Sequence, residues 1–95
     1  MKLIDKYQET GIIKAGELLL SPIDALEFIK EIVDKEILIL GVNLWCYVDN
    51  KIAENPGSLD LSEIDNPQKS VFVAKKFITQ YLPEGTAFVS FVLDE

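Results

Sequence analysis

Carboxylates are the main side chains in this sequence that could do chemistry. Its 95 residues include 16 Asp and Glu, one cysteine, no arginine and no histidine. Without imidazole, a Ser-His-Asp or Cys-His site is excluded, and Cys46, in an apolar run, is expected to be a buried and inert thiol. The densest carboxylate set is Asp60-x-x-Glu63-x-Asp65, which lacks the pattern of a calcium loop. We therefore expect neither a cofactor nor a catalytic residue.

The carboxylates concentrate in residues 49–67, which read as a long loop between two well-patterned elements. Lys51 is the only cation there, against five acidic residues: Asp49, Glu54, Asp60, Glu63 and Asp65. A small protein with few catalytic groups and a concentrated negative surface is expected to act by binding a positively charged partner, because complementary charge guides and orients association.

Two aromatic residues, Trp45 and Tyr47, stand just before this acidic stretch. One interpretation is ordinary core, with both rings under the second helix, since large rings usually pack. The other is that at least one ring is partly exposed beside the carboxylates, the combination of which interface hot spots are often made.

The composition also limits the partners and the compartment. A net charge of −7 disfavours nucleic acid and anionic membrane, because both are bound through cationic side chains, although acidity also serves solubility. No apolar run is long enough to span a membrane, and charges come too early for a signal peptide. With one cysteine, a reduced cytoplasmic setting is expected.

Residues 1–95 are expected to form one domain of α+β class. The pattern predicts a small mixed β-sheet of three to four strands packed against two α-helices, in the order (edge)-β-α-β-loop-α-β. A helix between the first two strands favours a right-handed parallel crossover, while the strand order stays open. The expected elements are a strand at 12–20, a helix at 21–34, a strand at 36–49, a helix at 66–82 and a strand at 86–93. Gly16 would be a bulge or a point of close approach in the first strand, and residues 2–9 could be a helical turn or an edge strand.

Hydrophobic spacing predicts which faces are buried. In the first helix these positions are Ile23, Ala25, Leu26, Ile29 and Val33. In the second they are Val71, Ala74, Phe77 or Ile78, and Tyr81. In the strand at 36–49 the even positions from Leu38 to Val48 form one unbroken apolar face.

Several stretches together resemble a known family. They are the capped helix Ser21–Glu27, the strand Ile37–Trp45 with its Ile-Leu-Gly segment, a later helix with Ser70, Ala74 and Tyr81, and the final strand Ala87–Val92. Across residues 18–93 the chain resembles one of the small bacterial immunity-protein families of polymorphic-toxin and contact-dependent growth inhibition (colicin-type) systems.

The resemblance implies an intracellular antidote that is not an enzyme. Such a protein binds its cognate toxin C-terminal domain, often a basic nuclease, and covers the active site or the substrate surface. Applied to this chain, the partner-binding residues would be the five carboxylates with Trp45 and Tyr47, and the protein would be a monomer before it meets the toxin. Two alternatives remain: a small metal-dependent module or enzyme using the carboxylates of 60–65, and a generic regulatory or structural subunit.

Overall fold

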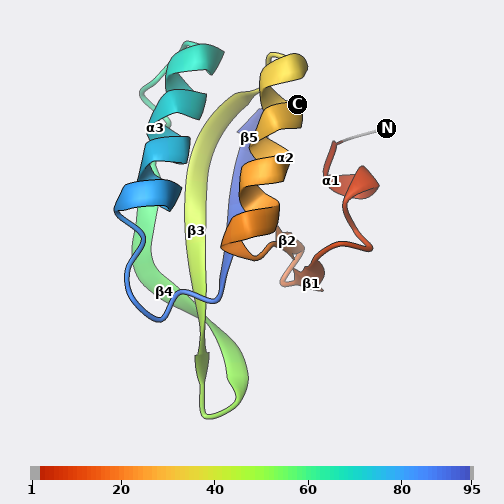
Figure 1. Ribbon diagram of the computed structural model, residues 1–95, viewed down its shortest axis with the longest axis vertical. Helices are drawn as coiled ribbons and strands as arrows, with labels where there is room; N and C mark the ends of the chain where they lie inside the picture. The colour runs from red at the N-terminus through yellow and green to blue at the C-terminus, as the bar shows by residue number, and fades with distance from the viewer. Residues whose placement is uncertain (1–2, 95) are drawn as a thin grey trace.

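The computed structural model describes residues 3–94 and shows an α+β fold, the class that the sequence predicts (Figure 1). Helices α2 and α3 lie side by side on one face of a twisted sheet (Figure 1). The elements are α1 Leu3–Lys6, β1 Ile12–Lys14, β2 Glu17–Leu19, α2 Pro22–Asp34, β3 Leu38–Val48, β4 Lys51–Asp60, α3 Pro67–Gln80 and β5 Phe88–Asp94. The open question about residues 2–9 is answered from Leu3 onward by the helical turn α1; residue 2 lies outside the described residues.

Within residues 3–94 the main sheet has three strands in the order β4-β3-β5, all antiparallel. The β1–β2 hairpin joins this sheet through one bridge, in which Leu20 and Val89 exchange N–H to carbonyl hydrogen bonds of 2.8 Å. The segment that enters α2 therefore runs parallel to β3, but β5 lies between them. The direct parallel crossover expected from the sequence is wrong in this respect.

Residues 12–20 are not one strand with a bulge, as the sequence suggested. β1 and β2 form a tight antiparallel hairpin in which Lys14 pairs with Glu17. The two residues between them, Ala15 and Gly16, both have positive φ, 53° and 78°. That backbone pattern belongs to a two-residue hairpin turn whose twist matches the strands.

The expectation of a long loop over residues 49–67 is also wrong. The chain turns at Asp49 and Asn50, whose φ values of 52° and 65° again give a two-residue turn, and returns as β4. β3 and β4 together form a long hairpin whose end extends past the helices (Figure 1). A break in register lies between Val42 and Leu44 of β3, where β4 has extra residues between Asn55 and Leu59.

Both main helices begin where local sequence signals place them. The Ser21 hydroxyl accepts the N–H of Asp24 at 3.2 Å, and Asn66 accepts the N–H of Lys69 at 3.0 Å. Each cap is followed by a proline at the first helical position, which lacks the N–H that would otherwise be unsatisfied. These starts depend on neighbours in sequence only.

The buried faces of the helices match the predicted ones only in part: Ala25, Ile29, Val71, Ala74 and Ile78 are buried as expected. In α2, Ile23 is 77% exposed and Val33 is 49% exposed. In α3, Tyr81 follows the last helical residue and is 62% exposed. The side chains that do face the sheet are Ala25, Phe28, Ile29 and Ile32 from α2, and Ser70, Val71, Ala74 and Ile78 from α3.

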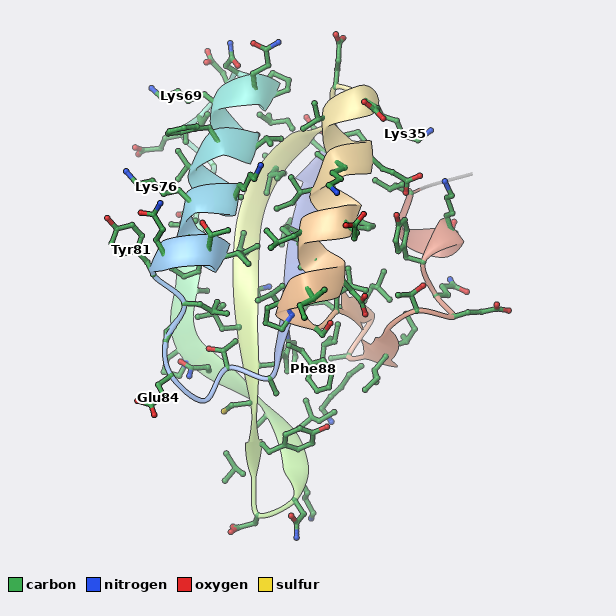
Figure 2. All side chains as sticks on the ribbon, in the orientation of Figure 1. Lys35, Lys69, Lys76, Tyr81, Glu84 and Phe88 are labelled. Carbon is green, nitrogen blue, oxygen red and sulfur yellow. The ribbon has the colours of Figure 1, made fainter. Side chains whose placement is uncertain are left out.

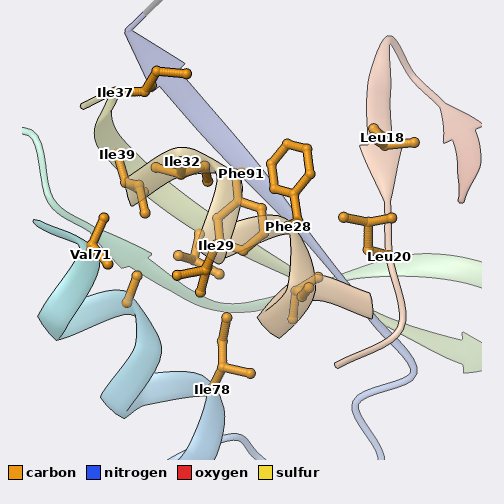
Figure 3. Packing of buried hydrophobic residues seen from close by; sticks show 14 of the residues in the cluster. Leu18, Leu20, Phe28, Ile29, Ile32, Ile37, Ile39, Val71, Ile78 and Phe91 are labelled. Carbon is orange, nitrogen blue, oxygen red and sulfur yellow. The ribbon is translucent and has the colours of Figure 1, made fainter. Parts of the chain in front are cut away.

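Phe28 explains why α2 takes this rotation. Its ring stacks on Phe91 of β5 at 5.4 Å between centroids and meets the edge of Tyr7 at 4.9 Å. Figure 3 shows Phe28 and Phe91 within the cluster of aliphatic side chains from both helices and the sheet. A large ring contributes more buried apolar area than the aliphatic residues of the alternative stripe.

The apolar face of β3 is interrupted. Ile39, Val42 and Leu44 face the helices, because the pairing with β5 shifts register between Ile39 and Gly41. The predicted run of even positions from Leu38 to Val48 is therefore not continuous: Leu40 is half-buried and Val48 is 52% exposed. Bulges of this kind turn a strand and change which side chains share a face.

The N-terminal segment packs against α2. Lys6 forms an ion pair with Glu31. Interaction of the Tyr7 hydroxyl with the same carboxylate, chiefly as a hydrogen-bond donor, raises the pKa of Tyr7 to about 12, and burial of Tyr7 is the second cause. The Oε2 atom of Glu31 is buried and has no hydrogen-bond partner among the described residues.

Candidate protein-binding surface

The sheet face opposite the helices is the candidate functional surface. On it, Trp45 of β3 stands between Phe88 of β5 and Glu54 of β4, and Tyr47 stands opposite Ile52. Directly opposed residues in an antiparallel pair point to the same side of the sheet. We call this set the open face, together with Val92 of β5 and Asp60 of β4, which both pair with Gly41. Neither α2 nor α3 covers it (Figure 1).

The open face presents aromatic and aliphatic surface to solvent. Tyr47 is 58% exposed and Val92 is 44% exposed. The Tyr47 ring meets Phe88 at 5.8 Å between centroids and 63° between planes, an edge contact that favours this orientation of the ring. A restrained tyrosine with a free edge suits a binding anchor, because little conformational entropy is lost when a partner covers it.

Trp45 is buried, as the core interpretation expects, but it does not lie under the second helix. Only 4% of its surface is exposed, and it lies on the open face. Its indole Nε1–H donates to the Ser90 hydroxyl at 3.0 Å. Of the two rings, only Tyr47 is available to a partner, and Trp45 supports the sheet beneath it.

A polar network holds the β1–β2 hairpin against this face. Ser90 donates its hydroxyl proton to Glu17 Oε1 at 2.7 Å, and the Asn43 amide donates to the same oxygen at 2.9 Å. Ser90 is fully buried at 0% exposure, so its two hydrogen bonds remove the penalty of burying a hydroxyl. Trp45, Ser90, Glu17 and Asn43 thus form one connected chain of donors and acceptors.

Sequence reasoning missed Glu17, Asn43 and Ser90. A signal was present for two of them, because Asn43 and Ser90 are single polar residues inside apolar strands, and the structure pairs them directly across β3 and β5. A buried polar side chain needs a partner. The signal could not reveal Glu17, which comes from a separate hairpin.

The structure separates the five predicted carboxylates. Glu54 and Asp60 belong to the open face, opposite Trp45 and Gly41, whereas Asp49 lies in the turn at the end of the β3–β4 hairpin. Glu63 and Asp65 follow β4 and precede α3. β4, with 10 residues, spans about 30 Å, and the five carboxylates are spread along it and beyond both of its ends. They therefore do not form one cluster, and only Glu54 and Asp60 share a face with Tyr47.

Asp60 has a structural task as well. Its side chain accepts the N–H of Ser62 at 2.9 Å, and the Ser62 hydroxyl followed by this backbone N–H lowers the pKa of the Asp60 carboxyl below its usual value. Asp60 is therefore ionised at neutral pH, and it stabilises the turn that leaves β4.

Residues 3–94 contain neither a cluster of metal-binding side chains nor a helix that could span a membrane. Among residues 3–94, no three Cys, His, Asp or Glu side chains lie close enough together to hold a metal ion. Cys46 is half-buried opposite Ala53, more exposed than the sequence suggested. None of the helices described has both the length and the apolar character needed to cross a membrane.

A hollow lies between the C-terminal end of α2 and the N-terminal end of α3. It has a volume of about 400 Å³ and is lined by Val33, Ile37, Pro67 and Val71 together with the polar Glu36, Asn66 and Gln68. It is open to solvent and contains no convergent set of charged groups.

Comparison with protein-family models, with curated proteins and with solved structures found no match to this chain. The geometry of its surfaces is what bears on its function.

Proposed function

We propose that the protein is a small bacterial immunity protein that binds a basic toxin domain, such as a nuclease, and prevents it from reaching its substrate. The observation that carries the proposal is the open face, where the exposed ring of Tyr47 and the apolar Phe88 and Val92 are bordered by Glu54 and Asp60. Apolar anchors next to charges that complement a partner are the usual composition of protein interfaces.

Different parts of this surface would contribute differently. Tyr47 would insert into the partner, while Glu54 and Asp60 would pair with lysine or arginine side chains that otherwise hold phosphate. Charge pairs that become buried at an interface couple by about 1.5–7 kcal/mol, whereas pairs at the rim mainly change the association rate. Asp49 lies in the hairpin turn and Glu63 and Asp65 lie beyond the end of β4, so none of the three stands at a strand position of the open face. We assign them to steering.

The proposal includes a place and a state of assembly. An antidote to a toxin that acts inside the cell would work in the cytoplasm. It would be monomeric until it meets the toxin, because the open face must remain free.

Titration calorimetry with the toxin domain encoded beside this gene tests the proposal. Tyr47→Ala should weaken binding by about 30-fold or more, since hot-spot truncations cost about 2 kcal/mol or more. Glu54→Lys and Asp60→Lys should weaken it further and remove protection in a bacterial growth assay. Glu9→Lys makes the same charge change at an exposed residue of the α1–β1 connection and should leave affinity within about threefold, because surface changes away from an interface have small effects.

Two results would count against the proposal in different ways. Absence of any complex would reject the immunity role. A tight complex that none of the open-face variants weakens would keep the role but move the binding surface elsewhere on the molecule.

A further inference from the structure

Helix α3 carries a second surface, which faces away from the core. Lys69, Phe72 and Lys76 recur at helical spacing, and Lys75 and Tyr81 flank them; these five residues are the α3 stripe. Phe72 is 66% exposed and Tyr81 is 62% exposed, and all three lysines are exposed. Figure 2 shows Lys69, Lys76 and Tyr81 on the side of α3 that points away from α2.

The charge of α3 is opposite to that of the protein. The chain has a net charge of −7, yet α3 contains three lysines and no carboxylate. Among the described residues, the ion pairs present involve Lys6 and Lys30, not the lysines of α3. Exposed charges act over about 8 Å at physiological salt, so α3 presents a positive potential locally even though the molecule as a whole is negative.

The fold does not account for this composition. α3 packs on the sheet through Ser70, Val71, Ala74 and Ile78, and the Ser70 hydroxyl fixes the helix to β3 by accepting the Ile39 N–H at 3.1 Å. Phe72 contributes little buried area with two thirds of its surface in water. A phenylalanine this exposed, set among unpaired lysines, combines the apolar and charged elements of an interaction surface.

We infer that the α3 stripe binds a short acidic segment of a protein partner, one that carries apolar side chains between its carboxylates. The lysines would pair with the carboxylates, and Phe72 and Tyr81 would cover the apolar side chains. This surface lies on the helical layer, and the inference does not depend on the toxin-binding role of the open face.

The surroundings of the stripe favour a short segment over a nucleic acid. A helix of 14 residues is about 21 Å long, and carboxylates lie beyond both of its ends, at Glu63 and Asp65 before it and Glu84 after it. A long polyanion would meet these carboxylates, while α3 offers only three lysines to neutralise its phosphates, the contacts from which nucleic-acid affinity comes. The chain also has no arginine, the preferred residue for phosphate recognition.

A second copy of the chain fits less well. A symmetric dimer through α3 would place six lysines against one another, since a two-fold interface joins the same patch on both copies. Contact between α3 of one copy and the acidic β4 of the next would not close and would form open chains.

NMR titration of the ¹⁵N-labelled protein with two synthetic 15-residue peptides tests the inference. One peptide contains glutamate alone, and the other contains glutamate with leucine at every third or fourth position. Both should shift the amide signals of Lys69, Phe72 and Lys76, and the leucine peptide should bind about fivefold or more tightly. Phe72→Ala should abolish that difference. The double variant Lys69→Glu with Lys76→Glu should weaken both peptides by about tenfold, since each exposed ion pair contributes modestly.

The matched control is Lys14→Glu with Lys35→Glu, which changes the net charge equally at exposed positions on β1 and after α2. It should bind both peptides like the wild type. Equal loss in both double variants, or no shifts at α3 at millimolar peptide, would overturn the inference. Stronger shifts at α3 with a 15-nucleotide oligo-dT, or dimerisation through α3 in sedimentation, would overturn it in favour of nucleic acid or a second copy.

Discussion

Ser90 is the residue on which the open face depends most directly. Its hydroxyl accepts the indole N–H of Trp45 and donates to Glu17, while it is itself fully buried. The Ser90 hydroxyl oxygen of β5 is therefore hydrogen-bonded both to β3, through Trp45, and to the β1–β2 hairpin, through Glu17.

Ser90→Ala should lower the free energy of unfolding by about 1–3 kcal/mol, because the buried indole N–H of Trp45 loses its acceptor. Urea denaturation followed by circular dichroism measures this. Ser58→Ala, at an exposed position of β4, should change stability by less than about 0.5 kcal/mol. Equal stabilities of the two variants would show that the network contributes nothing to the fold.

Tyr7 gives the fold a dependence on alkaline pH. Its folded-state pKa is about 12, above the ordinary value of 10.0, so between these values the folded protein keeps a proton that the unfolded chain has lost. Stability from this group is therefore complete below pH 10 and falls as pH rises toward 12.

Tyr7→Phe should remove part of this decline, and Tyr47→Phe, at an exposed ring, should not. Unfolding free energies between pH 9 and 12 test it, together with absorbance of tyrosinate. Glu31→Gln should return the Tyr7 pKa toward its usual value; a titration unchanged by this substitution would contradict the assigned cause.

At the scale of elements, local signals were predictive and pairings were not. Ser21 and Asn66 cap α2 and α3 as their sequence context indicates, because each cap bonds a backbone three residues away. The rotation of α2 was not predictable, since two apolar stripes compete and the choice depends on Phe28 meeting Phe91 from the far end of the chain.

The sequence predicts a loop where β4 lies for a physical reason. Pro56 and Gly57 normally argue against a strand interior, and the break in register at this point accommodates them. Because β4 is not predicted, the sequence identifies Glu54, Asp60 and Tyr47 as candidate binding residues but does not predict that the β3–β4 pairing places them on one face of the sheet. The Glu17–Ser90 bond, between residues 73 positions apart, lies beyond any local pattern.

The turn Asp49–Asn50 determines the geometry of the β3–β4 hairpin. Because Asn50 has φ of 65°, Asn50→Val should lower stability by about 1–2 kcal/mol, as a branched side chain is strained there, whereas Asn50→Gly should maintain or raise it. Thermal unfolding compares them, with Ser58→Val as a control in extended strand backbone. A harmless Asn50→Val would contradict the two-residue turn.

At the scale of the whole molecule, charge is divided between layers. The helical layer carries the lysines of α3, and the open face and the connections around β4 carry Glu54, Asp60, Glu63 and Asp65. A net charge of −7 opposes association of identical copies, while the separation of sign lets one molecule offer different surfaces to a basic and an acidic partner.

β4 is an edge of the main sheet, and an uncovered edge invites pairing with another chain. Here the edge is interrupted: β4 has three residues between Asn55 and Leu59 where β3 has only Asn43 between Val42 and Leu44. Pro56, one of those residues, also lacks an N–H to offer a neighbouring strand. We expect this interruption to keep the protein monomeric.

Deleting Pro56 and Gly57 removes the two extra residues and preserves the alternation of faces, so the edge becomes continuous. Sedimentation velocity from about 10 to 500 µM, the range in which exposed edges associate, should then show dimers, while the wild type remains a 10.7 kDa species. Pro56→Ala with Gly57→Ala keeps the extra residues and should stay monomeric. A deletion variant with native circular dichroism that is monomeric throughout would show that net charge, and not the broken edge, prevents pairing.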